Sequence, residues 1–197
     1  MIMFLEQQSK EQRDHYAKLL NAAGAISNLF SESFEPYLVP RITENLFCKA
    51  FDAENLSRSD VSADAMKDGI GFGIKTFLKK NGRSLEKVAE FNGDHSLYSS
   101  LPLVEKVKKI AQLRNERLET TKRIYGLREI IYHCVVREAG KIFVYETPCP
   151  LIDVENIKDI KETGSAIQFS DPSSEYSFNI SKSTLYKRFV TENILLE

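Results

Sequence analysis

The segment from Asp60 to Asn92 constrains the fold of this chain more than any other part of the sequence. It contains the dipeptide Asp68-Gly69, which favours a tight hairpin turn. After this turn, apolar residues alternate with small or polar ones: Ile70, Phe72 and Ile74 against Gly71, Gly73 and Lys75. A period of two is typical of a strand with one buried face. Residues 60–78 are therefore predicted to form an antiparallel strand pair, with Lys75 on its second strand.

The remaining hydrophobic patterns predict a mixture of helices and strands. Helices are expected at 6–30, 41–51, 84–92 and 103–124, with Ser84 as the N-cap of the third. Strands are expected at 130–137 and 141–146, joined through Ala139-Gly140, and at 166–169 and 176–180. A short helix at 154–161 and a last helix capped by Ser181 complete the pattern. This order predicts a mixed α/β fold, in which helices flank one central mixed sheet.

Size and composition predict a single domain of an ordinary globular protein. The chain has 197 residues and a net charge of −1, so no global positive charge drives it to nucleic acid. Its three cysteines form no CxxC pair, which favours reduced thiols and a cytoplasmic location. No apolar run approaches about 18 residues, so no membrane span is expected. The final Leu196-Glu197 is read either as a native end or as a cloning remnant after a domain cut from a longer chain.

Acidic residues around Lys75 suggest chemistry on a phosphodiester. Asp64 ends the first expected strand, and Lys75 follows eleven residues later across the turn. Adjacent strands bring such residues onto one sheet face. Glu90 is expected to enter from the following helix, with Glu86 one turn before it. Carboxylates hold Mg²⁺, and a lysine beside the metal-bound water can orient that water. Asp60 is the alternative to Asp64 as the first acidic residue.

These residues give the chain a resemblance to the PD-(D/E)xK nuclease superfamily, as in type II restriction enzymes. The usual pattern is an acidic residue followed by Glu-x-Lys or Asp-x-Lys on the next strand. Here the tripeptide is Gly73-Ile74-Lys75, so the acid before the lysine is missing. Some restriction enzymes with a small residue there use a Glu from the next helix, and Glu90 stands at about that spacing. The resemblance covers residues 40 to 92 and also points to Glu44 on an N-terminal helix.

The resemblance implies a restriction-endonuclease-like fold and a magnesium-dependent DNA endonuclease of a restriction or defence system. Asp64 and Glu90 would hold Mg²⁺, with Mn²⁺ as a substitute and Glu44 assisting. Lys75 would position the attacking water. The expected substrate is double-stranded DNA, cut to leave a 3′ hydroxyl and a 5′ phosphate. Because one site handles one phosphodiester, a twofold homodimer is the default expectation.

Simpler interpretations remain open for each of these residues. Lys75 can be the polar side of an amphipathic strand, Asp64 a turn cap, and Glu44 and Glu90 solvated helix residues. The missing acid before Lys75 also fits a binding module, in which the same fold recognises DNA or a protein without cutting. His15, His95 and His133 lack metal-ligand spacing and are read as structural or surface residues. Cys134 neighbours His133, but adjacent strand residues face opposite ways, so no catalytic pair is expected.

Three further features are candidate contacts to DNA. The C-terminal segment supplies Lys182, Lys187 and Arg188, which could hold phosphates at the start of a helix. The helix 103–124 has a basic outer side, although glutamates dilute it. The alternating Gly69, Gly71 and Gly73 leave one strand face bare, as the close approach of DNA or a packed helix would require.

Overall fold

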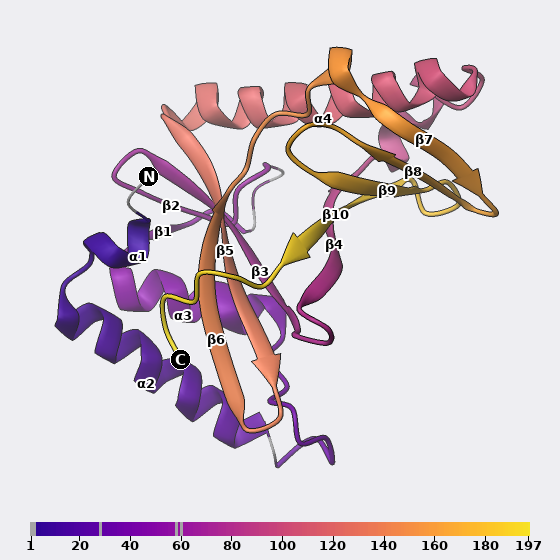
Figure 1. Cartoon of the computed structure of the whole chain (residues 1–197). Helices are drawn as coiled ribbons and strands as arrows, with labels where there is room; N and C mark the ends of the chain where they lie inside the picture. The colour runs from indigo at the N-terminus through magenta and orange to yellow at the C-terminus, as the bar shows by residue number, and fades with distance from the viewer. Residues whose placement is uncertain (1–2, 28, 58, 60) are drawn as a thin grey trace. The chain divides into compact units, whose positions relative to one another are not determined.

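The computed structural model describes residues 3–27, 29–57, 59 and 61–197, and these form two compact units. Unit 1 comprises residues 1–82, 121–149 and 191–197. Unit 2 comprises residues 83–120 and 150–190. Each unit has a five-stranded sheet of its own, as Figure 1 shows. The predicted mixed α/β class is confirmed, but the strands form two sheets instead of one central sheet.

The sheet of unit 1 is mixed and has the order β1-β2-β3-β5-β6. Its strands are β1 (Glu54–Asn55), β2 (Ala65–Lys67), β3 (Ile70–Leu78), β5 (Glu129–Glu138) and β6 (Lys141–Pro148). β3 pairs in parallel with β5, whereas the other neighbours are antiparallel. The β2–β3 hairpin turns at Asp68 and Gly69, whose φ angles are 50° and 76°. Positive φ at both positions is what a tight two-residue hairpin requires, so the predicted turn is confirmed.

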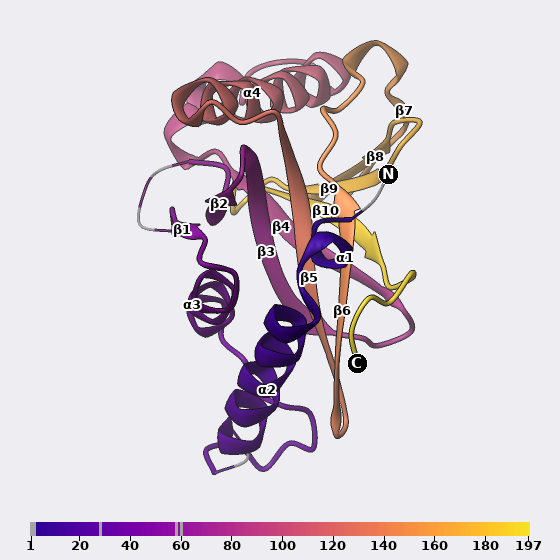
Figure 2. The same cartoon turned by 90° about the vertical axis from the view of Figure 1, so that its left-hand side faces the viewer.

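Three helices of unit 1 bury their apolar sides against this sheet. They are α1 (Phe4–Gln7), α2 (Lys10–Ser27) and α3 (Pro40–Phe51), and α2 and α3 lie against the sheet in Figure 2. The shared core joins Phe47 and Phe51 of α3 to Phe72 of β3, with ring centroids of Phe47 and Phe72 4.8 Å apart. The expected helix 6–30 is in fact two helices. Ser9 separates them, because its hydroxyl accepts the Gln12 N–H and caps α2.

The face of β3 that carries Gly71 and Gly73 is covered by side chains of unit 1 itself. A Cβ atom on Gly71 would stand 2.8 Å from Leu127, and one on Gly73 would stand 3.0 Å from the ring of Tyr132. Tyr132 lies directly opposite Gly73 in the parallel β3–β5 ladder. The glycines therefore make room for neighbouring side chains, and the expected approach of DNA or a helix at this place is not needed to explain them.

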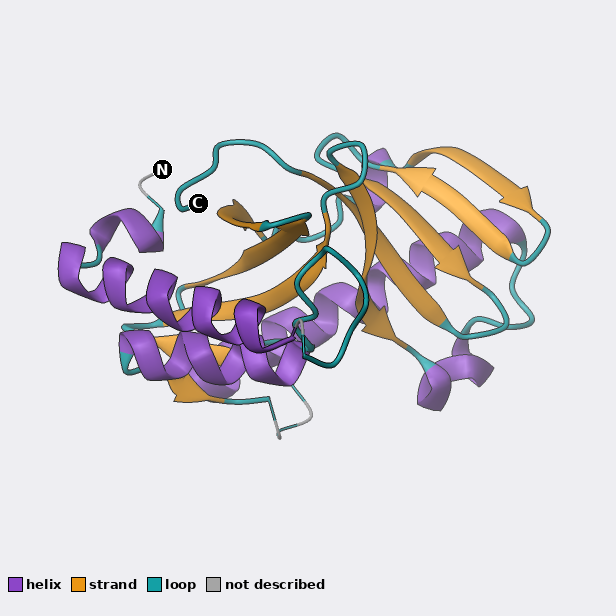
Figure 3. Ribbon diagram, turned by 90° about the horizontal axis from the view of Figure 1, so that it is seen from below, coloured by secondary structure: helices purple, strands orange, loops and turns teal. Residues whose placement is uncertain are grey.

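Unit 2 is built on an antiparallel sheet with the order β4-β10-β9-β8-β7. Its strands are β4 (Arg83–Glu90), β7 (Lys158–Thr163), β8 (Ala166–Ser170), β9 (Glu175–Asn179) and β10 (Thr184–Val190). The long helix α4 (Leu103–Tyr125) runs along these strands in Figure 3 and packs Val107 and Ile110 against them. Two 3₁₀ helices, η1 (Asn92–Leu97) and η2 (Val154–Asn156), lie in the connections.

The element predictions hold for most of the chain and fail at three places in unit 2. The helices at 41–51 and 103–124 and the strand pairs at 130–146 and 166–180 are confirmed. The predicted helices at 84–92 and from Ser181 onward are wrong, because these residues form strands β4 and β10. The region 154–161 has only one 3₁₀ turn before β7 begins. Among the described residues, no helix is long and apolar enough to span a bilayer.

Candidate active site

Asp64 is fixed in place by the backbone of the β2–β3 hairpin. It precedes β2, and its N–H donates to Phe72 O at 2.7 Å. Its carboxylate atom Oδ2 accepts the Ile74 N–H, also at 2.7 Å. The β2–β3 ladder ends at Phe72, so β2 offers no carbonyl to the Ile74 N–H. The Asp64 carboxylate accepts the hydrogen bond in its place. The carboxylate is thereby oriented beside the strand that carries Lys75.

Lys75 stands on β3, one residue after the N–H that binds Asp64. It lies opposite Cys134 in the parallel ladder with β5 and is half-buried. The neighbours Ile74 and Phe77 are buried, so the strand under this lysine is held by core packing. A lysine on a rigid central strand is positioned more sharply than one on a loop.

Glu44 of α3 belongs to the same cluster. Its residue exposure is only 8 %, and the Arg41 guanidinium lies 3.4 Å from its Oε2. Burial raises the pKa of Glu44, and the negative charge of Asp64 raises it further. The Ser57 hydroxyl, Arg41 and the Lys75 ammonium oppose this rise. Glu44 therefore lies within electrostatic reach of both Asp64 and Lys75, although the three come from separate segments.

Cys48 lies one helical turn after Glu44, and the charges of Glu44 and Asp64 also affect the pKa of its thiol. Burial, followed by the negative charges of Glu44 and Asp64, raises the pKa of the Cys48 thiol to about 11. At neutral pH the thiol is protonated, which makes it a poor nucleophile. The raised pKa of the thiol is a second indication that the negative charges of Glu44 and Asp64 act on the same part of α3.

Glu90 is not brought to these three residues within unit 1. It ends strand β4 of unit 2, where its carboxylate binds Lys87 Nζ at 3.1 Å and Asn92 Nδ2 at 2.5 Å. The helix that was expected to present Glu90 together with Glu86 does not form.

The alternative acid Asp60 lies outside the described residues. We therefore build the candidate site on Glu44, Asp64 and Lys75, and the metal-binding role of Glu90 stays a prediction.

The three basic residues near the C-terminus do not share a helix face. Lys182 is exposed in a turn, and its N–H donates to Asn179 Oδ1 at 2.9 Å. Lys187 and Arg188 are adjacent on β10 and so face opposite ways. Lys187 is buried, with its Nζ 4.7 Å from the Phe189 ring centroid. Arg188 binds Glu175 at 2.6 Å. Lys182 and Arg188 are thus the accessible members of the predicted set.

A buried polar network in unit 1 was not foreseen. The Tyr16 hydroxyl lies 3.0 Å from His133 Nε2, and His133 Nδ1 lies 2.9 Å from Glu146 Oε1. Burial raises the pKa of Tyr16, with the Glu146 charge as a second cause. Tyr16 therefore keeps its proton at neutral pH. In the neutral His133 tautomer whose Nε2 accepts the Tyr16 O–H, Nδ1–H donates to Glu146. The sequence does contain a signal for this network. His133 and Glu146 each occupy a strand position whose neighbours two residues away are apolar, which predicts that they face the core.

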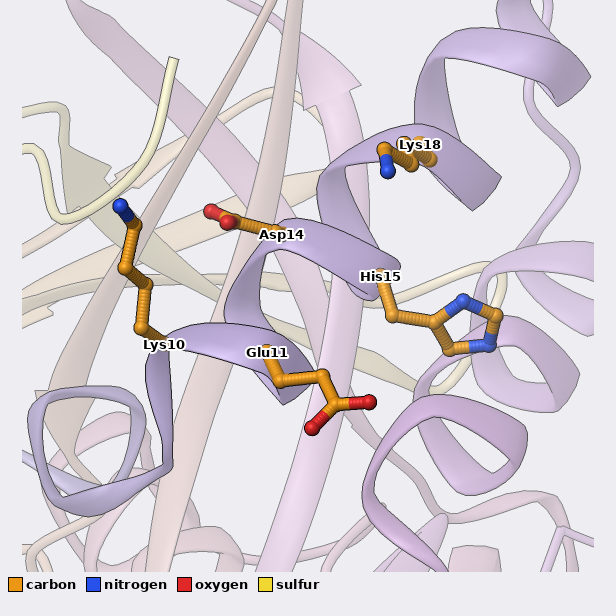
Figure 4. Close-up of a pocket in the computed structure, with 5 residues that line it drawn as sticks. All are labelled: Lys10, Glu11, Asp14, His15 and Lys18. Carbon is orange, nitrogen blue, oxygen red and sulfur yellow. The ribbon is translucent and has the colours of Figure 1, made fainter.

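A surface hollow on α2 does not coincide with the candidate site. Its lining residues are Lys10, Glu11, Asp14, His15 and Lys18, and Figure 4 shows their side chains spreading from a single helix. Lys10, Asp14 and Lys18 follow one another at i, i+4 spacing, which is typical of a solvated helix face with alternating charge.

The donor chemistry of the candidate site fits a hard divalent cation. Glu44 and Asp64 offer two carboxylates, and Mg²⁺ is commonly bound through one or two carboxylates with water and substrate oxygens completing its shell. In the described part of the chain, no group of three or more histidine, cysteine or acidic side chains is arranged to hold a metal. Comparison with protein-family models, with curated proteins and with solved structures found no match to this chain.

Proposed function

We propose that the chain is a magnesium-dependent phosphodiester hydrolase that cuts double-stranded DNA, of the restriction or defence type. One observation carries the proposal: the charges of Asp64 and Lys75 both act on the Glu44 carboxyl, although the three residues come from the residue before β2, from β3 and from α3. The PD-(D/E)xK resemblance predicted these three residues from their types and order. The grouping of two carboxylates with one lysine supports that interpretation.

Each residue has a role that follows from its placement. Asp64 is held through Oδ2 by the Ile74 N–H, and its other oxygen would face the cation. Glu44 would supply the second carboxylate. Burial and the negative charge of Asp64 raise its pKa, and the cation would offset both. When bound, Mg²⁺ supplies charge neutralisation and acidifies a water. The Lys75 ammonium would orient the attacking water and steady negative charge that develops on the phosphate.

A supercoiled-plasmid assay tests the proposal directly. Purified protein is incubated with Mg²⁺, with Mn²⁺ or with EDTA, beside the variants Lys75→Ala and Asp64→Ala. Lys79→Ala and Glu138→Ala are matched controls, because these two residues form a surface ion pair of 3.1 Å in the same unit. Metal-dependent nicking that disappears in both site variants and persists in both controls supports the proposal.

The binding module stays as the second candidate, because Gly73 stands where the family pattern has an acid. Under that function the protein would not cut DNA with either metal but would shift it in a gel. The affinity would fall with salt, since phosphate contacts release counterions. It would survive Lys75→Ala. Cutting that persists in both site variants would show that Asp64 and Lys75 are not the catalytic residues.

A further inference from the structure

Five large exposed apolar side chains of unit 1 lie at the end of α2 and in the segment that follows it. We call this surface the 26–37 patch. Its members and their exposed fractions are Ile26 (56 %), Leu29 (79 %), Phe30 (80 %), Phe34 (86 %) and Tyr37 (57 %). Single exposed apolar residues are ordinary on proteins, but five within twelve residues of chain are not.

Backbone contacts hold the patch in a defined shape. Leu29 N–H donates to Ile26 O and Phe30 N–H donates to Ser27 O, both at 3.0 Å. Tyr37 N–H donates to the Ser27 hydroxyl at 2.8 Å. These bonds fold the segment back on the end of α2, so the backbone that carries four of the five side chains is tied to that end of the helix.

The far side of the segment is held by the β5–β6 hairpin, beside which it lies in Figure 1. Phe34 O accepts the N–H of Gly140 at 3.2 Å, and Pro36 O accepts Arg137 Nη1 at 2.9 Å. Pro36 also packs on Gly24, where a Cβ atom would stand 3.3 Å away. The aromatic side chains are therefore presented outward on a preorganised support, which lowers the entropy lost when a partner binds.

The size of the patch matches what a self-association needs. At these exposed fractions the five side chains present about 650 Å² to solvent, taking roughly 150–250 Å² for a large side chain. The largest apolar patch on a typical monomer is about 300–600 Å². Two copies of the patch would bury about 1,300 Å² together, within the range of about 1,200–2,000 Å² for a stable interface.

We propose that the 26–37 patch is a homodimer interface, in which it meets the same patch of a second copy across a twofold axis. An isologous contact needs only one self-complementary surface, and an aromatic, apolar surface meets that condition. The rim has both signs of charge, since Glu35 lies within the segment and Arg137 donates to Pro36 O beside it. This mixture lets the two rims form opposite-charge pairs. The inference does not depend on the proposed nuclease activity.

Sedimentation velocity over a wide range of concentrations tests the proposal on the full chain. The test variant is Phe30→Ser with Phe34→Ser, and Leu29→Ser is a second, independent variant. All three side chains are at least 79 % exposed, so their removal should leave the core intact, which a urea unfolding curve checks. Ile124→Ser is the matched control, because Ile124 is 63 % exposed but lies on α4, outside the patch.

We expect the wild-type chain and the Ile124→Ser control to sediment with twice the monomer mass. Both patch variants should sediment as monomers at the same concentrations, with at least a tenfold weaker dimer. A wild-type chain that stays monomeric at every concentration would overturn the proposal. A dimer that persists in both patch variants would also overturn it, because the interface would then lie elsewhere. A plasmid-cutting assay on the same samples reports separately on the proposed function.

Discussion

The Oδ2 atom of Asp64 accepts a hydrogen bond of 2.7 Å from the backbone N–H of Ile74, the residue before Lys75. The proposed cation ligand and the proposed catalytic lysine are thus linked through one peptide unit. This bond leaves the other carboxylate oxygen for a cation. The position of Asp64 relative to Lys75 is set by the backbone of the hairpin and does not rely on a side-chain contact between them.

Asp64→Asn should separate the structural from the catalytic role of this carboxyl. Asparagine keeps an oxygen for the Ile74 N–H but loses the charge, so the free energy of unfolding should change by less than about 1 kcal/mol. DNA cleavage should fall at least about a hundredfold. Asp64→Ala should lose cleavage and also about 1–3 kcal/mol of stability, because the buried N–H loses its acceptor. Urea unfolding and plasmid nicking measure the two effects. An asparagine variant that cuts at the wild-type rate would remove Asp64 from the mechanism.

Cys48 should report on the charges of the candidate site even without a substrate. Its thiol has a pKa of about 11, in part because of the negative charges of Glu44 and Asp64. Removing either charge should lower this pKa and speed alkylation of Cys48 at a fixed pH, more so for Glu44→Gln than for Asp64→Asn. Mass spectrometry of the Cys48 peptide after timed iodoacetamide treatment measures the rate. Equal rates in all three proteins would mean that the carboxylates do not surround Cys48.

The raised pKa of Glu44 gives the stability of unit 1 a defined pH dependence in EDTA. A free glutamate has a pKa of 4.5, and the folded value lies above it. As pH rises from 4.5 through the folded pKa, the unfolded state ionises first, so the contribution of Glu44 to stability falls. Glu44→Gln lacks this fall and should therefore gain stability relative to wild type between pH 4 and pH 7. The thermal midpoints of the two proteins at the two pH values measure the difference, with Glu138→Gln as a surface control.

Mg²⁺ should stabilise the wild-type chain and have little effect on the variants Asp64→Asn and Glu44→Gln. A ligand that binds only the folded state stabilises it by about 2.7 kcal/mol at a hundred times its dissociation constant. Titration of the thermal midpoint with MgCl₂ measures this effect, and NaCl at matched ionic strength controls for screening. An equal rise of the thermal midpoint in all three proteins would mean that Mg²⁺ binds at a site other than Asp64 and Glu44.

Tyr16→Phe should destabilise unit 1 without touching the candidate site. The variant leaves His133 Nε2 buried without its 3.0 Å partner, at a cost of about 1–3 kcal/mol. Glu138→Gln is the surface control in the same unit and should change stability by less than about 0.5 kcal/mol. Urea unfolding curves of wild type and of both variants measure these changes in the free energy of unfolding. Equal stabilities would show that the Tyr16 contact contributes nothing.

Local signals predicted the part of the fold that carries Asp64 and Lys75. The hairpin between them is specified by Asp68-Gly69 and by alternation within a few residues, so no distant partner had to be known. Glu44 required more, because its electrostatic influence on Asp64 and Lys75 depends on how α3 packs on β3. The family resemblance pointed to Glu44, whereas the apolar pattern of the helix did not.

The two wrong helices have one common cause. Strands β4 and β10 pair with each other, for example Lys87 with Tyr186, although about a hundred residues separate them. The segment Leu85-Glu86-Lys87-Val88-Ala89-Glu90 is rich in helix formers, and its long-range partner overrides that preference. β10 lies between β4 and β9 in the sheet, and its pairing with β4 joins segments that local sequence patterns do not connect. Glu90 was misplaced by this error, and so were Lys187 and Arg188.

The closing residues of the chain belong to unit 1, although the residues just before them belong to unit 2. Leu196 forms a bridge with Val144, and its carbonyl accepts the Val144 N–H at 2.9 Å, so the chain end borders strand β6. Unit 1 is thus assembled from three stretches of sequence, and unit 2 interrupts them twice, at 83–120 and at 150–190. To produce unit 1 as a separate protein, both of these stretches would have to be excised and the cut ends rejoined.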